Sequence, residues 1–132
     1  MANLMITKQC NLHCSYCFAN EFVNKDKDIM SFDNFMKCMD FLSSNPKERI
    51  GLIGGEPTIH PEFGRMLAAI IDSPFQSACL FTNGILVDSF FNELRNSRFQ
   101  ILVNLNSPKD IGENNYDRIM RNMDEMINRL YM

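Results

Sequence analysis

The sequence predicts an α/β protein in which four strand–helix units build a parallel sheet with helices packed over it. Two observations support this class. Short apolar segments alternate four times with longer segments whose apolar residues recur every three or four positions, and no low-complexity stretch interrupts the alternation. Right-handed strand–helix–strand connections then make the strands parallel. One domain is expected over residues 1–132, because 45% hydrophobic composition is sufficient for a core.

The four expected strands are short and apolar, and each leads directly into an unusual polar segment. The strands are residues 4–6, 49–53, 77–81 and 99–105. The segments after them begin with a cysteine-rich loop, then GGEP, TNG and NLNS. Ligands of parallel sheets and barrels bind at the carboxyl ends of the strands, so these four segments are where a site is expected.

The expected helices each combine an apolar stripe with a recognisable start or end. Ser31 is the predicted N-cap of a helix whose apolar residues run from Phe32 to Leu42, and Asn45-Pro46 is predicted to end it. Pro61 is predicted to open the next helix, because proline is favoured in a first helical turn. Two further helices are expected near 89–96 and 115–130, the last with a clear polar face.

Composition and charge exclude several classes of function. The formal net charge is −3 and no local run forms a basic patch, which argues against a nucleic-acid or anionic-membrane surface. The longest apolar stretches are too short to span a membrane, and the first residues do not resemble a signal segment, so a cytoplasmic location is expected. Five cysteines, three of them crowded together, favour reduced thiols over a disulfide framework.

The crowded cysteines are Cys10, Cys14 and Cys17, in the loop after the first strand. One short loop can direct all three sulfurs at a single iron–sulfur cluster. Four cysteine ligands would close such a cluster, whereas three leave one iron open to a small molecule. A short Cys/His tract is also typical of zinc sites, with His13 or another side chain as fourth ligand, so both interpretations stand at this point.

The string TKQCNLHCSYCF at residues 7–18 resembles the CxxxCxxC signature of the radical S-adenosylmethionine (radical SAM) enzymes. The resemblance implies that Cys10, Cys14 and Cys17 ligate a [4Fe-4S] cluster, whose open iron takes the amino and carboxylate groups of S-adenosylmethionine. These cysteines are therefore the predicted metal ligands and catalytic residues. Tyr16, the aromatic before the last cysteine, is expected near the adenine of the cofactor. His13 falls at a variable position and is expected at the surface.

The turn Gly54-Gly55-Glu56-Pro57 is the second candidate for ligand binding. Two glycines allow the backbone to approach a ligand closely, and a carboxylate suits an ammonium group. The turn resembles the GGE motif of the same family, which implies that Gly54, Gly55 and Glu56 bind the methionyl amine of S-adenosylmethionine. A plain strand-to-helix turn is the alternative. His60, shortly after, is interpreted as a helix-start residue and not as a catalytic base.

The ends of the third and fourth strands supply further candidate contacts. Thr82-Asn83-Gly84 resembles the family's TNG turn, and Asn83 or Thr82 is expected to contact the cofactor. Related enzymes often have a Ser-Leu-Asp-Gly string after the fourth strand, where this chain departs with Asn104-Leu105-Asn106-Ser107. The Asn104 amide both donates and accepts hydrogen bonds, so it is retained as a predicted contact to a ribose hydroxyl or a carboxylate.

The resemblance covers nearly the whole chain and implies a fold and an activity. The fold is a partial TIM-like (β/α) barrel, with about four of the six strand–helix units usual in this family. Residues 1–132 are therefore expected to be the N-terminal portion of a radical SAM core, not sufficient for full turnover. The activity is reductive cleavage of S-adenosylmethionine to a 5′-deoxyadenosyl radical, which takes a hydrogen atom from an unassigned substrate.

Partners and alternatives complete these expectations. The motifs look most like the branch with peptide and sulfatase maturases, so a peptide or protein is one candidate for the unassigned substrate, and an external electron donor is expected. Two open sheet edges favour either a longer parent enzyme or pairing of two copies. A zinc-binding module and a non-catalytic scaffold remain alternatives. Cys38 and Cys79 lie among apolar neighbours and are expected in the core.

Overall fold

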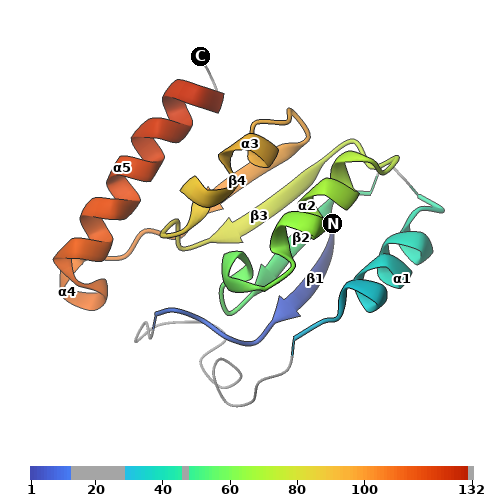
Figure 1. The fold of residues 1–132 in the computed structure, drawn as a ribbon, viewed down its shortest axis with the longest axis horizontal. Helices are drawn as coiled ribbons and strands as arrows, with labels where there is room; N and C mark the ends of the chain where they lie inside the picture. Colours follow the sequence, from blue (N-terminus) through green and yellow to red (C-terminus); the bar gives the residue numbers. More distant parts are fainter. Residues whose placement is uncertain (13–28, 46–47, 131–132) are drawn as a thin grey trace.

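A computed structural model describes residues 1–12, 29–45 and 48–130 of the chain. Its centre is one parallel sheet whose strands lie side by side in sequence order (Figure 1). The strands are β1 (Ala2–Thr7), β2 (Ile50–Gly54), β3 (Ala78–Thr82) and β4 (Phe99–Val103). This arrangement confirms the predicted α/β class and the four strand–helix units.

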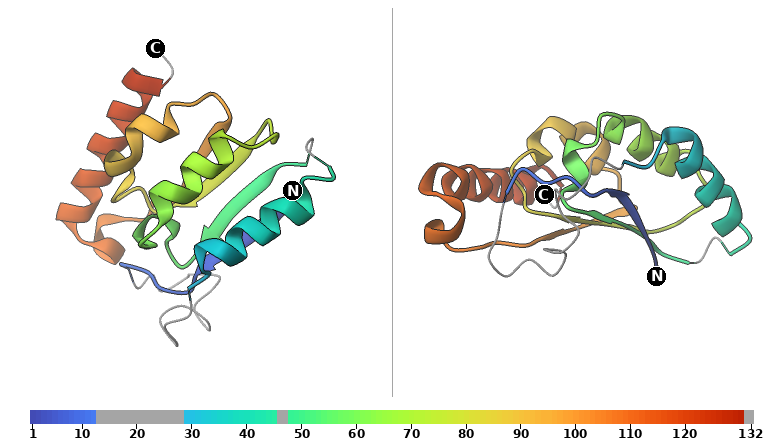
Figure 2. Two further views of the ribbon diagram at one scale, coloured as in Figure 1. Left: turned by 45° about the vertical axis from the view of Figure 1, so that its right-hand side comes forward. Right: turned by 90° about the horizontal axis from the view of Figure 1, so that it is seen from below.

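Helices connect the strands and gather on one side of the sheet. They are α1 (Phe32–Leu42), α2 (Phe63–Ile71), α3 (Phe91–Leu94), α4 (Pro108–Ile111) and α5 (Glu113–Leu130). The view from below in Figure 2 shows α1, α2 and α3 over one face of the sheet, while the opposite face has no helix among the described elements. This one-sided cover is what a part of a (β/α) barrel with its helices outside would show.

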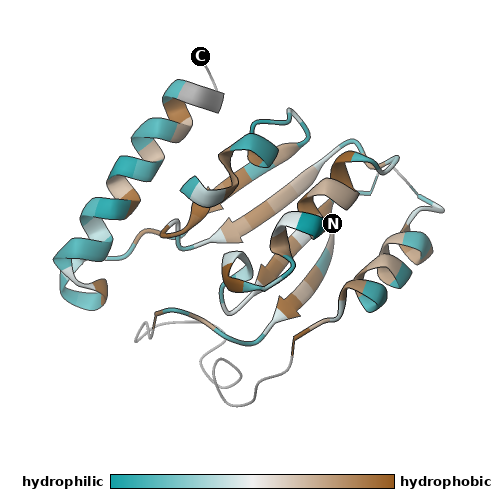
Figure 3. Cartoon of the chain, in the orientation of Figure 1, coloured by the Kyte–Doolittle hydropathy of each residue, from teal (hydrophilic) through white to brown (hydrophobic). Residues whose placement is uncertain are grey.

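The core lies between the sheet and these helices. Alternate strand residues, such as Leu52 and Leu80, are fully buried against Phe35, Phe63 and Met66. Figure 3 shows the same pattern, with apolar colour along the strands and polar colour on the outer sides of the helices. The neighbouring residues in each strand point to the uncovered face and are available to line a site.

Cys79 is buried, as expected, and Cys38 packs against this core. Cys79 is buried in β3, and burial raises the pKa of its thiol, while the nearby Arg49 guanidinium partly opposes the rise. Cys38 is half-buried in α1 and packs against the core. No helix in the described ranges has the length and apolar character needed to cross a membrane.

The start of α2 differs from the sequence prediction. Pro61 does not open the helix, which begins two residues later at Phe63, and a 3₁₀ helix over Pro57–Ile59 precedes it. The reason is local, because the Glu62 backbone lies outside the helical region, at φ −112° and ψ 23°, and the helical hydrogen bonds begin with the Met66 N–H donating to the Glu62 carbonyl. By contrast Ser31 caps α1 as predicted, since its hydroxyl accepts from the N–H of Asn34 at 3.1 Å.

Two other predicted elements are shorter than expected. The helix near 89–96 is divided into a 3₁₀ helix (Val87–Phe90) and α3, because the Phe90 backbone leaves the helical region where its ring packs edge-on against Phe63, 4.8 Å between centroids. The last strand ends at Val103 instead of residue 105, because its partner strand β3 ends at Thr82, the residue paired with Val103.

Candidate active site

The carboxyl ends of the strands border a cleft of about 680 Å³ on the uncovered face of the sheet. Apolar side chains of β2, β3 and β4, including Ile53, Phe81 and Leu102, form part of its wall. The sequence-predicted residues that line it are Cys10, Gly54, Gly55, Glu56, Thr82, Asn83 and Asn104. Segments far apart in the sequence are thus assembled around one cavity. Cys14, Cys17, Tyr16 and His13 lie outside the described residues.

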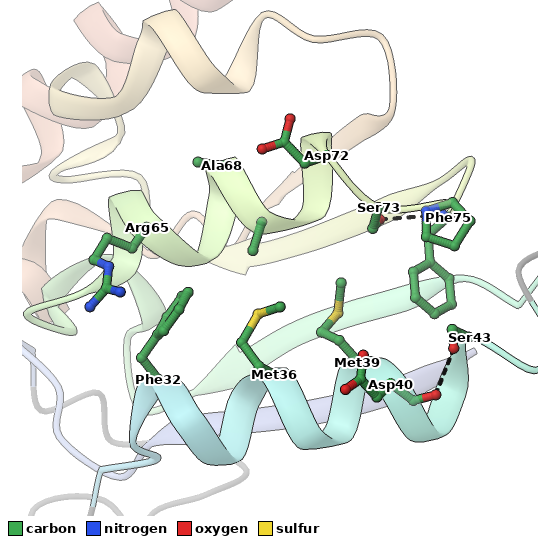
Figure 4. A pocket seen from close by; sticks show the side chains of 12 residues that line it. Phe32, Met36, Met39, Asp40, Ser43, Arg65, Ala68, Asp72, Ser73 and Phe75 are labelled. Carbon is green, nitrogen blue, oxygen red and sulfur yellow. Dashed lines mark hydrogen bonds between the residues drawn. The ribbon is translucent and has the colours of Figure 1, made fainter.

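A second hollow of about 460 Å³ lies between α1 and α2 (Figure 4). Phe32 and Met36 point from α1 toward α2 across it, and the Arg65 guanidinium lies 4.0 Å from the centre of the Phe32 ring. The described site residues predicted from the sequence are not among those that line this groove. We therefore assign the candidate site to the cleft at the strand ends.

The Gly54-Gly55 turn is clamped against the segment that leads into Cys10. The N–H of Gly55 donates to the Thr7 carbonyl at 3.0 Å, and the N–H of Glu56 donates to the Gln9 carbonyl at 2.8 Å. A Cβ atom on Gly54 would overlap the Thr7 carbonyl oxygen, and one on Gly55 would overlap that of Gln9. The close approach that two glycines permit is therefore used, at least in part, to dock the turn on the cysteine loop.

Glu56 is almost fully buried, with 1% of its surface exposed, and its carboxylate joins the ends of β2 and β3. Oε1 accepts from the Thr58 N–H at 3.3 Å and from the hydroxyls of Thr58 and Thr82 at 2.6 Å each. Oε2 accepts from the Asn83 N–H at 2.7 Å. A carboxylate oxygen has more than one acceptor site, so Oε2 retains capacity for a further donor from the cleft.

Asn83 is buried, and both the nitrogen and the oxygen of its side-chain amide make a hydrogen bond within the protein. Its Nδ2 donates to Oδ1 of Asn11 at 2.7 Å, and its Oδ1 accepts from the N–H of Ile85 at 3.1 Å. Thr82 is similarly engaged, because its hydroxyl donates to Glu56 and accepts from the N–H of Gly84 at 3.1 Å. Both residues line the cleft, and their direct contact with a cofactor stays a prediction.

Cys10 is half-buried at the wall of the cleft, and its sulfur accepts from the N–H of Leu12 at 3.4 Å. Amide hydrogen bonds to a cysteine sulfur stabilise its thiolate form and tune iron–sulfur clusters. The described ranges contain no group of three metal-binding side chains, since two of the predicted ligands lie outside them. The described residues fit a cluster, because the Cys10 sulfur accepts a hydrogen bond from an amide N–H and lies beside a cleft of ligand size.

Asn104 and Asn106 follow β4 at the same end of the sheet. The Asn104 N–H continues the strand ladder by donating to the Thr82 carbonyl at 2.9 Å, while its side chain is exposed and makes no hydrogen bond within the described part of the chain. This amide is available to a ligand. Asn106 is buried and lines the cleft, although sequence reasoning did not select it. Asn11 was also missed, and its position beside Cys10 was the available signal.

His60 has a structural position, as the sequence indicated. Its ring is 4% exposed and lies between two segments: Nε2 is 2.7 Å from the Met30 carbonyl, and Nδ1 accepts from the Glu62 N–H at 3.0 Å. The Nδ1 acceptor assigns the ring proton to Nε2. His60 thus ties the chain before α1 to the start of α2.

Replacing His60 by Ala is expected to lower the free energy of unfolding by about 1–3 kcal/mol, because two partly buried backbone groups lose their partner. Urea unfolding measures this change. His60→Asn is the matched control. The Oδ1 of the asparagine can still accept from the Glu62 N–H, but its side chain is too short to reach the Met30 carbonyl, so this variant should recover part of the lost stability. An alanine variant as stable as the wild type would contradict this role.

Comparison with known proteins gives a consistent result. The model of the radical SAM superfamily matches residues 4–130. A GTP 3′,8-cyclase of Clostridium perfringens (strain SM101 / Type A) is 30% identical over 112 residues, which are 81% of this chain and 34% of that protein. A tungsten-containing aldehyde ferredoxin oxidoreductase cofactor-modifying protein of Pyrococcus furiosus is 35% identical over 94 residues, covering 69% of this chain and 26% of the relative.

Solved structures show the same fold at lower sequence identity. The structure of native anSMEcpe with bound AdoMet and Cp18Cys peptide superposes with a TM-score of 0.73 at 20% identity, and the match covers 97% of this chain and 39% of the anSMEcpe chain. BtrN in complex with AdoMet and 2-DOIA gives a TM-score of 0.67 at 19% identity, and the match covers 89% of this chain and 54% of the BtrN chain. The chain spans about a third of the length of the first of the two curated relatives described above and about a quarter of the second.

Proposed function

Because this chain belongs to the radical SAM superfamily, we propose that it holds a [4Fe-4S] cluster on Cys10, Cys14 and Cys17 and binds S-adenosylmethionine in the adjoining cleft. The observation that carries the proposal is the shared cleft itself. Cys10, the Glu56 carboxylate and the exposed Asn104 amide all line it, although they follow three different strands. The donor set suits the two ligands, with a thiolate for iron and a carboxylate for an ammonium group.

When bound, a cluster reduced by one electron from an external donor would supply, with S-adenosylmethionine, reductive cleavage of a carbon–sulfur bond to methionine and a 5′-deoxyadenosyl radical for hydrogen abstraction. The residues of the chain bind and orient. The Leu12 N–H donates to the Cys10 sulfur, and Oε2 of Glu56, which accepts from the Asn83 N–H, would also accept from the methionyl ammonium. Asn104 would hydrogen-bond the ribose or the carboxylate, and apolar side chains such as Phe81 would exclude water from the cleft.

Further features accompany this proposal. The GGE turn and the cysteine string support a peptide or protein substrate and an external electron donor by their resemblance to the maturase branch. A cytoplasmic location agrees with the reduced cysteines that a cluster requires. Pairing of two copies through the outer strands β1 and β4 would satisfy the backbone groups at these edges.

Anaerobic reconstitution with iron and sulfide tests the function. The wild-type protein is expected to bind one cluster, and the electron paramagnetic resonance spectrum of its dithionite-reduced form should change when S-adenosylmethionine is added, because one iron is open. Cys10→Ser is expected to lose most of the bound iron. Cys38→Ser is the matched control, since Cys38 lies in α1 and packs against the core, so this variant should retain the cluster.

Two results would contradict the proposal in different ways. Stoichiometric zinc with no colour after reconstitution would favour the zinc-binding module. A cluster whose spectrum is unaffected by S-adenosylmethionine would favour a non-catalytic scaffold.

A further inference from the structure

We infer that Asn83 is a positioning residue for the cysteine loop, acting through the hydrogen bond from its Nδ2 to Oδ1 of Asn11, here called the Asn clip. This inference rests on the proposed function, because it concerns how the cluster-binding sulfur is held. The clip joins the segment after β1 to the segment after β3, two strands separated in the sheet by β2. It is distinct from the clamp between the glycine turn and the same loop.

The orientation of the clip follows from its neighbours. Oδ1 of Asn83 accepts from the N–H of Ile85, so the amide must present Nδ2 to Asn11. Asn11 then offers its carbonyl oxygen. The donor is buried, with 9% of Asn83 exposed, and the two atoms are 2.7 Å apart. A short hydrogen bond with a buried, fixed donor restrains the residue that accepts it.

Asn11, the residue that the Asn clip restrains, is adjacent in the sequence to the sulfur ligand Cys10. Asn11 lies between Cys10 and Leu12, and the Leu12 N–H donates to the Cys10 sulfur. Fixing Asn11 therefore fixes both the thiol and the amide that supports it. The backbone N–H of Asn83 also donates to Oε2 of Glu56, the predicted acceptor of the methionyl ammonium. One residue thus sets the position of the sulfur relative to the carboxylate.

A double-mutant cycle tests the clip. Asn11→Ala, Asn83→Ala and the double variant are reconstituted anaerobically, and the rate at which an iron chelator removes the cluster is measured. Each single variant is expected to lose iron about fivefold faster, the effect of one neutral hydrogen bond. The double variant should be no faster than the quicker single variant, because both substitutions remove the same bond. The spectral change on adding S-adenosylmethionine should weaken in all three.

Asn122→Ala is the control for general loosening. The Asn122 Nδ2 donates to the carbonyls of Gly84 and Ile85, so its loss disturbs the same turn without removing the clip. This variant should lose thermal stability and yet release iron at the wild-type rate. Asn11 is exposed, so Asn11→Ala is expected to fold and carries the test even if Asn83→Ala does not.

The outcomes separate this inference from the proposed function. If the increases in the rate of iron release multiply in the double variant, the positioning role is overturned while the proposed function stands. The same holds if Asn122→Ala releases iron as fast as Asn83→Ala. A wild-type protein that binds no cluster would overturn the function. If Asn11→Ala releases iron at the wild-type rate, the Asn clip does not hold the cysteine loop, whatever the other variants show.

Discussion

Gly55→Ala is expected to lower the free energy of unfolding by about 3 kcal/mol, the upper range for an overpacked site. The new Cβ would overlap the carbonyl oxygen of Gln9 and lie 3.1 Å from the backbone nitrogen of Cys10. Both are backbone atoms, so no side chain can rotate away. The glycine turn and the cysteine loop must separate, which also weakens the hydrogen bond from Glu56 N–H to Gln9. Urea unfolding and iron content after reconstitution measure the two effects.

Gly64→Ala is the matched control for this prediction. Its added Cβ would meet only the Phe90 ring at 3.7 Å, an ordinary contact, and Gly64 is the second residue of α2. Alanine in a helix is more favourable than glycine, so this variant should be at least as stable as the wild type. If Gly55→Ala unfolds at the same urea concentration as the wild type, the clamp between the turn and the loop is not as described.

Glu56→Gln is expected to lower the free energy of unfolding by about 1.5–3 kcal/mol, because the carboxylate accepts four hydrogen bonds in a buried position. Glutamine replaces one oxygen with an NH₂ group. In one orientation this group faces the N–H of Thr58, and in the other it faces the N–H of Asn83. Either way a buried donor loses its acceptor. Chemical denaturation measures the loss.

Substitutions of Thr82 separate the hydroxyl contribution from packing. Thr82→Val keeps the volume but removes the donor to Glu56 and the acceptor for the Gly84 N–H, whereas Thr82→Ser keeps the hydroxyl. The valine variant should be the less stable by about 1–3 kcal/mol. If Glu56→Gln is as stable as the wild type, the hydrogen bonds of the Glu56 carboxylate do not contribute as proposed. Equal stability of Thr82→Val and Thr82→Ser would lead to the same conclusion.

Local patterns were sufficient for most of the fold. The spacing of apolar residues indicated strands around Leu52 and Leu80 and a helix after Ser31, because the period of burial differs between a strand and a helix. Helix starts were less accurate. Pro61 was a reasonable first helical residue by preference, but the Glu62 backbone lies outside the helical region and the helix begins after it, at Phe63. The His60 ring, which lies between two segments at this point, is not visible in a local pattern.

By itself, the sequence determined the parallel α/β architecture and the placement of the motifs at the strand ends, because periodicity and turn residues act over a few positions. Only the tertiary structure decided what each site side chain contacts. Glu56 meets Thr82, and Asn83 meets Asn11, across gaps of 26 and 72 residues. Such partners are set by strand order and register, which bring the ends of β1, β2 and β3 to one edge, so the network that supports the site exists only once the sheet has formed.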